Sequence, residues 1–330
     1  MSLDHDSGSD AIEIPTGPSS SDEGQVKQPA REDQETRENK TKKFVDAMWS
    51  GSDADIKAAF RERVEDLFEK FPNLNRDYLV LALFEPLNSI DDSDLDSVFR
   101  SLKQSNPEKS KNVCLILLSR GGSIEPAYQI SKLCKQWSSS KFVVVIPRYA
   151  KSAATLIALG ADEIHIGPLG QLGPIDPQLG GLPALGVSQA LQTIAQLAEK
   201  FPGSATMFAE YLKRVLTVEQ IGYCDRIAQS ASQYAHRLLA TKPSIAGRVE
   251  TIANRLVVEY KDHAFVIDID ESRSLLGEEL VKSGTAELEF AEALYQLFDD
   301  SNFWLKFHNK KLLITGDPAE NIIIFERQRK

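Results

Sequence analysis

The chain has 330 residues, of which 42% are hydrophobic and 26% charged, a balance typical of soluble globular proteins. Its formal net charge of -10 argues against nucleic acids and anionic membranes as main partners, because both are themselves negatively charged. No apolar stretch approaches the ~20 residues that a membrane span needs, and no secretory signal pattern is visible. The composition therefore predicts a cytoplasmic protein without a membrane span.

The N-terminal segment, residues 1–42, is rich in Ser, Asp, Glu, Gly and Pro. Beyond Leu3, its large aliphatic residues are essentially Ile12 and Ile14. Such a segment buries too little apolar surface to offset the entropy lost on ordering. We therefore expect residues 1–42 to form a disordered acidic tail, with order beginning near Lys43.

A helix starting after Ser52 is the first ordered element with a clear pattern, because Ile56, Phe60 and Val64 recur at helical spacing. Short apolar runs of strand length then alternate with helical patterns. The strand-like runs are Tyr78 to Phe84, Val113 to Leu118, Phe142 to Ile146 and Glu163 to Ile166. The apolar stripe of Glu125 to Trp137 predicts a helix between the second and third runs. This order predicts βαβ units and an α/β fold with a mainly parallel sheet.

The Gly- and Pro-rich segment 167–181 is too apolar for a flexible linker, so we expect a packed loop near the functional site. Helical patterns follow at about 187–200, 205–215 and 217–241, and again at Glu289 to Phe298. We assign one domain to residues 43–290 and a C-terminal extension to residues 291–330. The cysteines form no CxxC pair, so they are expected to be buried free thiols in a reducing compartment: Cys114, Cys134 and Cys224.

Two strand ends carry residues suited to acyl transfer. The second strand-like run opens into a glycine pair, Gly121 and Gly122, and the third leads to Ser152 at the start of a helix. Because ligands gather at the carboxyl ends of parallel strands, these features are expected to converge. The glycines offer backbone N–H groups to an oxyanion, and Ser152 offers a nucleophile. The pairing favours a hydrolase.

Three sequence blocks make the prediction more specific: Arg120 to Ile130, Pro147 to Ile164 and Leu172 to Gln178. In this order they resemble the serine dehydrogenase proteinase family, a group of ClpP/crotonase-fold serine peptidases related to signal peptide peptidase A. The resemblance covers roughly residues 85 to 290. It implies a ClpP/crotonase-like spiral of ββα units, self-association, and ATP-independent hydrolysis of peptide bonds.

The resemblance also assigns roles to residues. Ser152 matches the nucleophile, and Gly122 and Ala153 match the backbone donors of the oxyanion hole, with Gly121 beside them. The sequence departs from the family pattern where alanines replace the glycines after the serine, and where Lys151 replaces a neutral residue. Small residues are kept, so the site retains room for a substrate.

The general base stays open between a histidine, His263, and one of two lysines, Lys200 or Lys213. Asp176 stands where ClpP-type enzymes have a histidine, so the ClpP triad cannot be used unmodified. His263 resembles a histidine block of the family, and Asp262 or Asp268 is expected to orient it. His165, on the last strand-like run, is interpreted as structural.

A Ser–Lys dyad is the alternative, as in signal peptide peptidase A, and Lys200 and Lys213 lie near that family's spacing from the serine. Such a lysine must be neutral, so its pKa has to fall from about 10.4 toward 7–8. The sequence does not decide between lysine and histidine.

The chain is therefore predicted to be a cytoplasmic, homo-oligomeric serine peptidase acting on peptides or proteins. No cofactor or metal is predicted, since the chain has no P-loop, no dinucleotide fingerprint and no metal-ligand spacing. Two alternatives remain: a crotonase-like acyl-CoA hydratase or isomerase, and a catalytically inactive assembly module of the ClpP fold.

Overall fold

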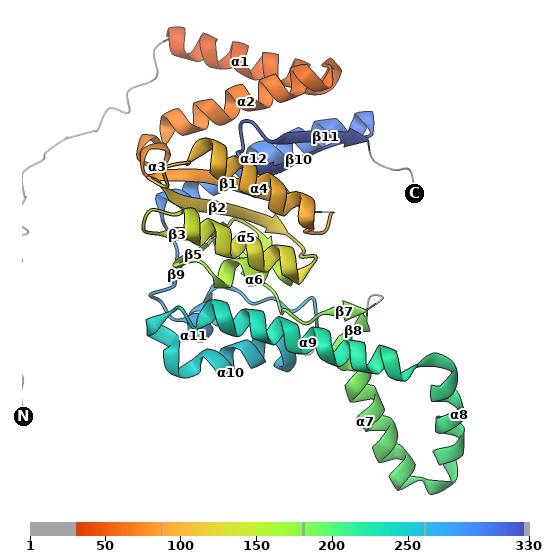
Figure 1. Ribbon diagram of the computed structural model, residues 1–330. Coiled ribbons are helices and arrows are strands. Elements are labelled where there is room, and N and C mark those ends of the chain that lie inside the picture. The colour runs from red at the N-terminus through yellow and green to blue at the C-terminus, as the bar shows by residue number, and fades with distance from the viewer. Residues whose placement is uncertain (1–30, 87, 180–181, 261, 327–330) are drawn as a thin grey trace, which may run out of the picture. The chain divides into compact units, whose positions relative to one another are not determined.

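The computed structural model describes residues 31–86, 88–179, 182–260 and 262–326 (Figure 1). Most of the predicted acidic tail thus lies outside the described residues. Helix α1 (Arg31–Ser50) begins within the segment that we predicted to be disordered. Its first half is polar but consists largely of Glu, Gln, Arg and Lys, which are good helix formers, and this explains why a helix forms there. From Lys43 onward the chain forms one compact unit.

A nine-stranded sheet is the centre of this unit. Its parallel part has the order β1 (Tyr78–Glu85), β2 (Asn112–Ser119), β3 (Phe142–Ile146), β5 (Glu163–Ile166) and β9 (Val281–Lys282). The short strands β4 (Tyr149–Ala150) and β6 (Gln171–Leu172) extend it beyond β2. A separate two-stranded ribbon joins β7 (Gln178–Leu179) to β8 (Leu182–Pro183). The predicted α/β fold with a mainly parallel sheet is confirmed.

Both faces of the sheet are covered by helices, as the continuous apolar strands require. Alternate residues of β1 divide between two cores: Leu81 and Leu83 face one, and Ala82 and Phe84 face the other. The first core is closed by α4 (Asp92–Ser105), α5 (Ile124–Trp137), α6 (Ala153–Leu159) and α9 (Val218–Leu239). The second is closed by α2 (Asp53–Lys70), α3 (Pro72–Asp77) and α12 (Ala286–Leu305).

Side-chain caps account for several helix starts. Ser52 caps α2 and Asp91 caps α4, each through a capping box with the residue three positions later.

His165 is 2% exposed and lies between Glu163 Oε2 at 3.1 Å and Thr285 Oγ1 at 2.8 Å, which agrees with a structural role. The three cysteines are buried and free.

Three helices form an arm that projects from the sheet domain: α7 (Ala184–Lys200), α8 (Ala205–Val215) and the first part of α9 (Figure 1). A 3-10 turn, η1 (Pro202–Ser204), joins α7 to α8. The chain then returns along α9 to η2 (Pro243–Arg248), α10 (Val249–Asn254), η3 (Arg255–Glu259) and α11 (Ile269–Leu276). No helix in the described parts of the chain is both long and apolar enough to cross a membrane.

The C-terminal segment contributes to the same sheet. After α12 and the turn η4 (Lys306–His308), strands β10 (Lys310–Gly316) and β11 (Ile322–Glu326) add antiparallel strands beside β1. The segment predicted as a C-terminal extension, residues 291–330, therefore contains two strands that form one edge of the central sheet.

Candidate active site

Ser152 lies directly before the first residue of α6, in a backbone conformation that non-glycine residues rarely adopt. Its φ is 52° and its ψ is -119°, values of the first central residue of a type II′ turn, where glycine is preferred. Such a conformation costs of order 1–3 kcal/mol and persists where the surrounding structure enforces it. Strained residues of this kind cluster at functional sites, so the geometry singles out Ser152 independently of its sequence neighbours.

The turn at Ser152 is held by hydrogen bonds on both sides. Lys151 N–H donates to Ser119 O at 3.0 Å, which ties the turn to the end of β2. Thr155 Oγ1 lies 2.7 Å from Ala150 O and 2.8 Å from Gly173 O, and it accepts from Gly173 N–H. The side chain of Ser152 takes no part in these bonds and makes no cap of α6, so its hydroxyl remains available.

The glycine pair lies against this turn, as predicted from the two strand ends. A Cβ atom placed on Gly121, whose φ is 110°, would come within 2.7 Å of Ser152 Cβ and 3.0 Å of Ala153 N. Gly122 runs beside Ile90, and its Cβ would lie 2.2 Å from Ile90 N and 2.4 Å from Ile90 O. Both positions require glycine because backbone approaches too closely for a side chain.

Gly122→Ala is expected to lower the free energy of unfolding by about 2–4 kcal/mol, because the added methyl group meets backbone atoms that cannot move aside. Chemical denaturation monitored by circular dichroism measures this change. Gly247→Ala is the matched control, since a Cβ there meets nothing within 4 Å, and its effect should stay within about 1 kcal/mol. Equal stability of the two variants would contradict the close approach at Gly122.

The backbone N–H groups of Gly122 and Ala153 are candidate donors to an oxyanion. Gly121 N–H donates to Ser119 Oγ at 3.1 Å, so this donor is already occupied. Within the described residues, Gly122 N–H and Ala153 N–H have no acceptor. Ala153 is the first residue of α6, where backbone N–H groups lack intrahelical partners. Of the predicted donors, the geometry therefore favours Gly122 and Ala153 over Gly121.

His263 is paired with a carboxylate that the sequence analysis did not assign to it. Its Nδ1 lies 2.7 Å from Asp176 Oδ1, and the two side chains are 33% and 7% exposed. This hydrogen bond is the main reason that the pKa of His263 is raised above its ordinary value, against the opposing effect of burial. Gln178 Nε2 holds the other carboxylate oxygen, Oδ2, at 2.9 Å.

The expectation that Asp262 or Asp268 orients His263 is wrong. Asp268 caps α11 by accepting from Glu271 N–H, and Asp262 accepts from Ala264 N–H. Both carboxylates are engaged in local turns, which is the usual role of Asp at such positions. The carboxylate that bonds to His263 is instead Asp176, which lies 87 positions earlier in the chain.

Hydrogen bonds join the segment that carries His263 to the segments around Asp176 and Lys151. Leu172 and Ile267 exchange two bonds, at 2.9 and 3.1 Å, and Ile175 N–H donates to Leu256 O at 2.8 Å. Lys151 Nζ donates to Phe265 O at 2.9 Å, so the residue before Ser152 contacts the segment that carries His263. The segment that carries His263 thus contacts the residue that precedes Ser152, and His263 is itself bonded to Asp176.

Part of the chain matches a known family of proteins. Residues 77–213 match the family of ClpP-like SDH-type serine proteinases. The resemblance expected from the sequence is therefore confirmed over this part of the chain. The match includes Ser152, the glycine pair and Asp176, and ends at Lys213.

Relatives of known sequence extend the comparison. Uncharacterized protein MJ0137 of Methanocaldococcus jannaschii is 34% identical over 127 residues, which is 38% of this chain and 43% of that protein. Uncharacterized protein MJ1495 of the same organism is 36% identical over 97 residues, 29% of this chain and 32% of that protein. The chain thus spans less than half the length of the curated relatives that it matches.

Solved structures with low sequence identity were also found. The 1510-N membrane-bound stomatin-specific protease in complex with a substrate peptide is 18% identical, with a TM-score of 0.42, covering 64% of this chain and 78% of that one. ClpP1 from Listeria monocytogenes is 15% identical, with a TM-score of 0.39, covering 67% and 99%.

The two lysines that the sequence offers as bases lie on the arm. Lys200 is the last residue of α7 and Lys213 is near the end of α8, and both are exposed. Lys200 Nζ lies 5.5 Å from the ring centroid of Phe201. Figure 1 shows α8 at the far end of the arm, whereas Ser152 begins α6 beside the sheet.

Lys242 is a buried lysine that the sequence analysis missed. Burial lowers its pKa to about 8, the range that a lysine base needs. Its Nζ, however, donates to Gly160 O and Ala161 O, at the C-terminal end of α6. Ser152 lies at the opposite end of that helix, so Lys242 satisfies terminal carbonyl groups rather than serving the nucleophile.

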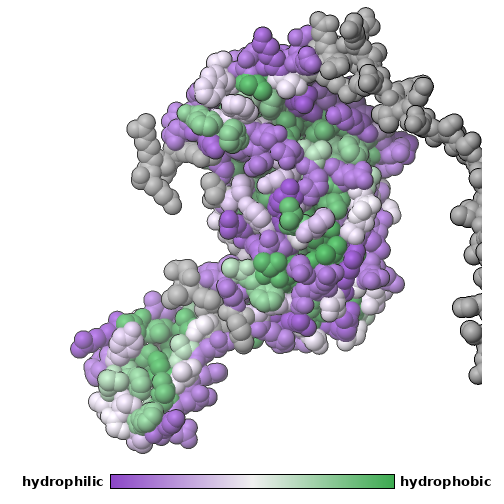
Figure 2. All heavy atoms as spheres, turned by 180° about the vertical axis from the view of Figure 1, so that it is seen from behind, coloured by the Kyte–Doolittle hydropathy of each residue, from purple (hydrophilic) through white to green (hydrophobic). Residues whose placement is uncertain are grey.

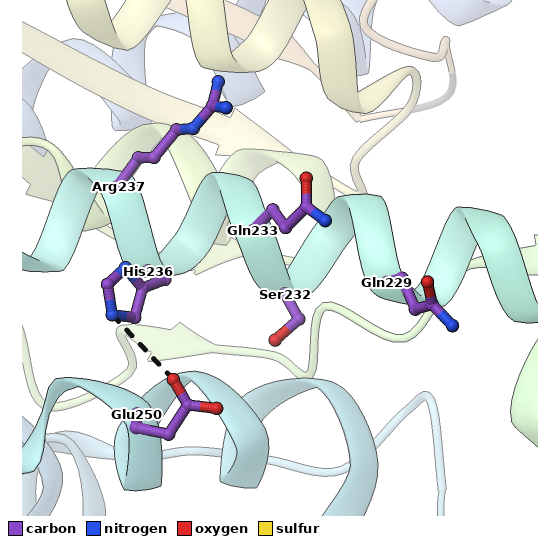
Figure 3. A pocket seen from close by; sticks show the side chains of 6 residues that line it. All are labelled: Gln229, Ser232, Gln233, His236, Arg237 and Glu250. Atoms are coloured by element: carbon purple, nitrogen blue, oxygen red, sulfur yellow. Dashed lines mark ion pairs between the residues drawn. The ribbon is translucent and has the colours of Figure 1, made fainter.

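A pocket of about 430 Å³ lies away from these residues, between α9 and the start of α10 (Figure 3). Its lining is polar, and His236 Nε2 approaches Glu250 Oε2 at 3.8 Å across it. The lining residues are Gln229, Ser232, Gln233, His236, Arg237 and Glu250. None of its lining residues belongs to the candidate active site.

Proposed function

We propose that the chain is a serine peptidase that hydrolyses peptide bonds without ATP. The observation that carries the proposal is the strained turn at Ser152, with a free hydroxyl next to two unpaired backbone donors. The pairing of His263 with Asp176 supports it, because a histidine oriented by a carboxylate is the usual activator of a serine nucleophile. The match to a family of serine proteinases supports the same reaction class.

In this proposal Ser152 Oγ attacks the peptide carbonyl carbon while His263 accepts the hydroxyl proton. Asp176 Oδ1 accepts a hydrogen bond from Nδ1–H of the imidazole, which leaves Nε2 as the basic nitrogen. Gly122 N–H and Ala153 N–H stabilise the oxyanion, and the first turn of α6 adds its positive dipole end. His263 then returns the proton to the leaving amine, and water releases the acyl group by the same steps.

The proposal differs from both rivals in what it requires of Ser152. A crotonase-like acyl-CoA enzyme shares the oxyanion geometry but relies on carboxylates, and its turnover would survive loss of the serine hydroxyl. An inactive assembly module would not react at all. The peptidase alone needs a nucleophilic serine.

Reaction with a fluorophosphonate probe tests the proposal. The folded chain should form a bond between Ser152 Oγ and phosphorus with release of fluoride, and intact mass and peptide mapping should place the adduct on Ser152. Heat-denatured chain is the control, because labelling that depends on the folded site must vanish there. Failure of the folded chain to react would favour the inactive module.

The rate of labelling is expected to rise with pH through a midpoint above 6.5, because only neutral His263 accepts the proton and its pKa is raised by Asp176. A pH series of labelling rates measures the midpoint. The raised pKa also means that the pair stabilises the folded state at acid pH, and this contribution is lost as the pH rises through the raised value. A midpoint below 6.5 would contradict the role of the pair.

Self-association is the second part of the proposal, and the arm supports it. Large apolar side chains are exposed along α7, η1 and α8: Leu197, Phe201, Met207, Tyr211 and Val215. Figure 2 shows apolar residues gathered on this part of the surface. Exposed apolar patches of this kind mark interaction sites. We propose a cytoplasmic homo-oligomer that acts on peptide or protein substrates.

A further inference from the structure

Two positively charged residues follow neighbouring strand ends beside Ser152. Strands β2 and β4 pair in parallel at Ser119 and Ala150, so the next residues, Arg120 and Lys151, stand side by side. The hydrogen bond from Lys151 N–H to Ser119 O, at 3.0 Å, fixes this register. Arg120 thus directly precedes the glycine pair, and Lys151 directly precedes the nucleophile.

Packing restrains both side chains. The stem of Lys151 covers Gly173, where a Cβ would lie 2.4 Å from Lys151 Cδ, and its Nζ donates to Phe265 O. Arg120 is exposed and its guanidinium lies 5.4 Å from the ring centroid of Tyr149. Restrained cations lose less entropy on binding a ligand than free surface lysines do.

Neither charge forms an ion pair with a carboxylate in the part of the chain that the structure describes. Among the described residues, no ion pair includes Arg120 or Lys151. Two carboxylates of the neighbouring segments are hydrogen-bonded to other groups: Asp176 to His263 and Gln178, and Asp262 to Ala264 N–H. Burial lowers the pKa of Lys151, and the neighbouring charge of Arg120 lowers it further, against the opposing effect of Asp262. An anion bound between them would relieve this repulsion.

We propose that Arg120 and Lys151 form a carboxylate-binding subsite beside Ser152, so that the peptidase prefers substrates carrying a carboxylate next to the scissile bond. The inference rests on the proposed peptidase function. A guanidinium binds carboxylate through two parallel hydrogen bonds, and an ammonium adds a point charge. The carboxylate comes from an acidic side chain or from the free C-terminus of the substrate.

Matched quenched-fluorescent peptides test the subsite. One pair differs only by Glu or Gln at the residues flanking the scissile bond, and a second pair differs only by a free or amidated C-terminus. Wild-type protein should cleave the charged member of one pair with a kcat/KM at least ~10-fold higher. A preference within the first pair identifies a side-chain carboxylate, and within the second a terminal one. Equal rates within both pairs would overturn the subsite.

Ratios within each variant separate recognition from general loss of activity. Arg120→Gln and Lys151→Gln should each reduce the preference, Arg120→Lys should retain part of it, and Arg120→Glu should reverse it toward a Lys-containing peptide. Lys57→Gln, which removes an exposed positive charge from α2, is the matched control and should keep the wild-type ratio. An unchanged ratio in the Arg120→Glu variant would contradict the proposal.

A binding experiment keeps the two proposals distinguishable. Ser152→Ala protein should bind the fluorescein-labelled charged peptide more tightly than its neutral counterpart in fluorescence anisotropy, and Arg120→Glu should remove the difference. If the folded chain neither labels with fluorophosphonate nor cleaves peptides, the peptidase function fails while this difference still reports on the subsite. Equal binding of both peptides by the Ser152→Ala protein would overturn the subsite.

Discussion

Replacing Ser152 by alanine is expected to lower kcat for peptide hydrolysis by ~10⁴-fold or more, because the reaction loses its nucleophile while the oxyanion donors remain. The substitution removes one side-chain oxygen, and this oxygen makes no hydrogen bond to the described residues, so folding should be unaffected. Steady-state cleavage of a quenched peptide measures the first effect. Thermal unfolding monitored by circular dichroism measures the second.

Ser152→Gly makes the same prediction sharper. Glycine adopts a φ of 52° with a ψ of -119° without strain, so this variant should be as inactive as Ser152→Ala yet more stable than wild type, by about 1 kcal/mol. Ser274→Ala in α11 is the matched control and should change neither property. Activity retained in Ser152→Ala would exclude the serine mechanism and favour a carboxylate-dependent acyl-CoA enzyme. A Ser152→Gly variant less stable than wild type would show that the turn is not strained.

The sequence was sufficient to predict the parts of the fold that depend on local patterns. The β-branched run Phe142 to Ile146 is a strand, and the serine and glycine pair that follow two neighbouring strands do meet. Parallel pairing brings the carboxyl ends of strands to one edge, so their convergence follows from topology alone. The fold class and the close approach of Ser152 to the glycine pair could therefore be predicted from the sequence.

Other features depend on contacts between distant segments. Asp176 and His263 are 87 positions apart, and they meet because Leu172 pairs with Ile267 and Ile175 bonds to Leu256. Asp176 was visible in the sequence only as an aspartate where a histidine is usual, with nothing to indicate its partner. The antiparallel pairing of β10 with β1 joins segments from opposite ends of the domain and is equally non-local. Pairing of this kind leaves no periodic signal in one sequence.

The role of Asp176 leads to the second large effect. Asp176→Asn is expected to lower kcat by ~10³–10⁴-fold, because an amide does not stabilise the imidazolium and favours the wrong tautomer of His263. Asparagine has the same shape and keeps an oxygen for Gln178, so stability should change little. The same substitution removes the main cause of the raised pKa of His263, so the midpoint of the residual labelling rate should move to lower pH.

Lysine variants decide whether the histidine is the base. Lys200→Ala and Lys213→Ala remove exposed side chains on the arm, and each should retain wild-type kcat if His263 accepts the serine proton. His263→Ala should match Asp176→Asn or exceed its loss, and combining the two should add little, because the residues act as one unit. The opposite pattern, an active Asp176→Asn variant together with an inactive Lys213→Ala variant, would assign proton transfer to the lysine. It would also require the arm of one copy to reach the nucleophile of another, because α8 lies far from α6 within one chain (Figure 1).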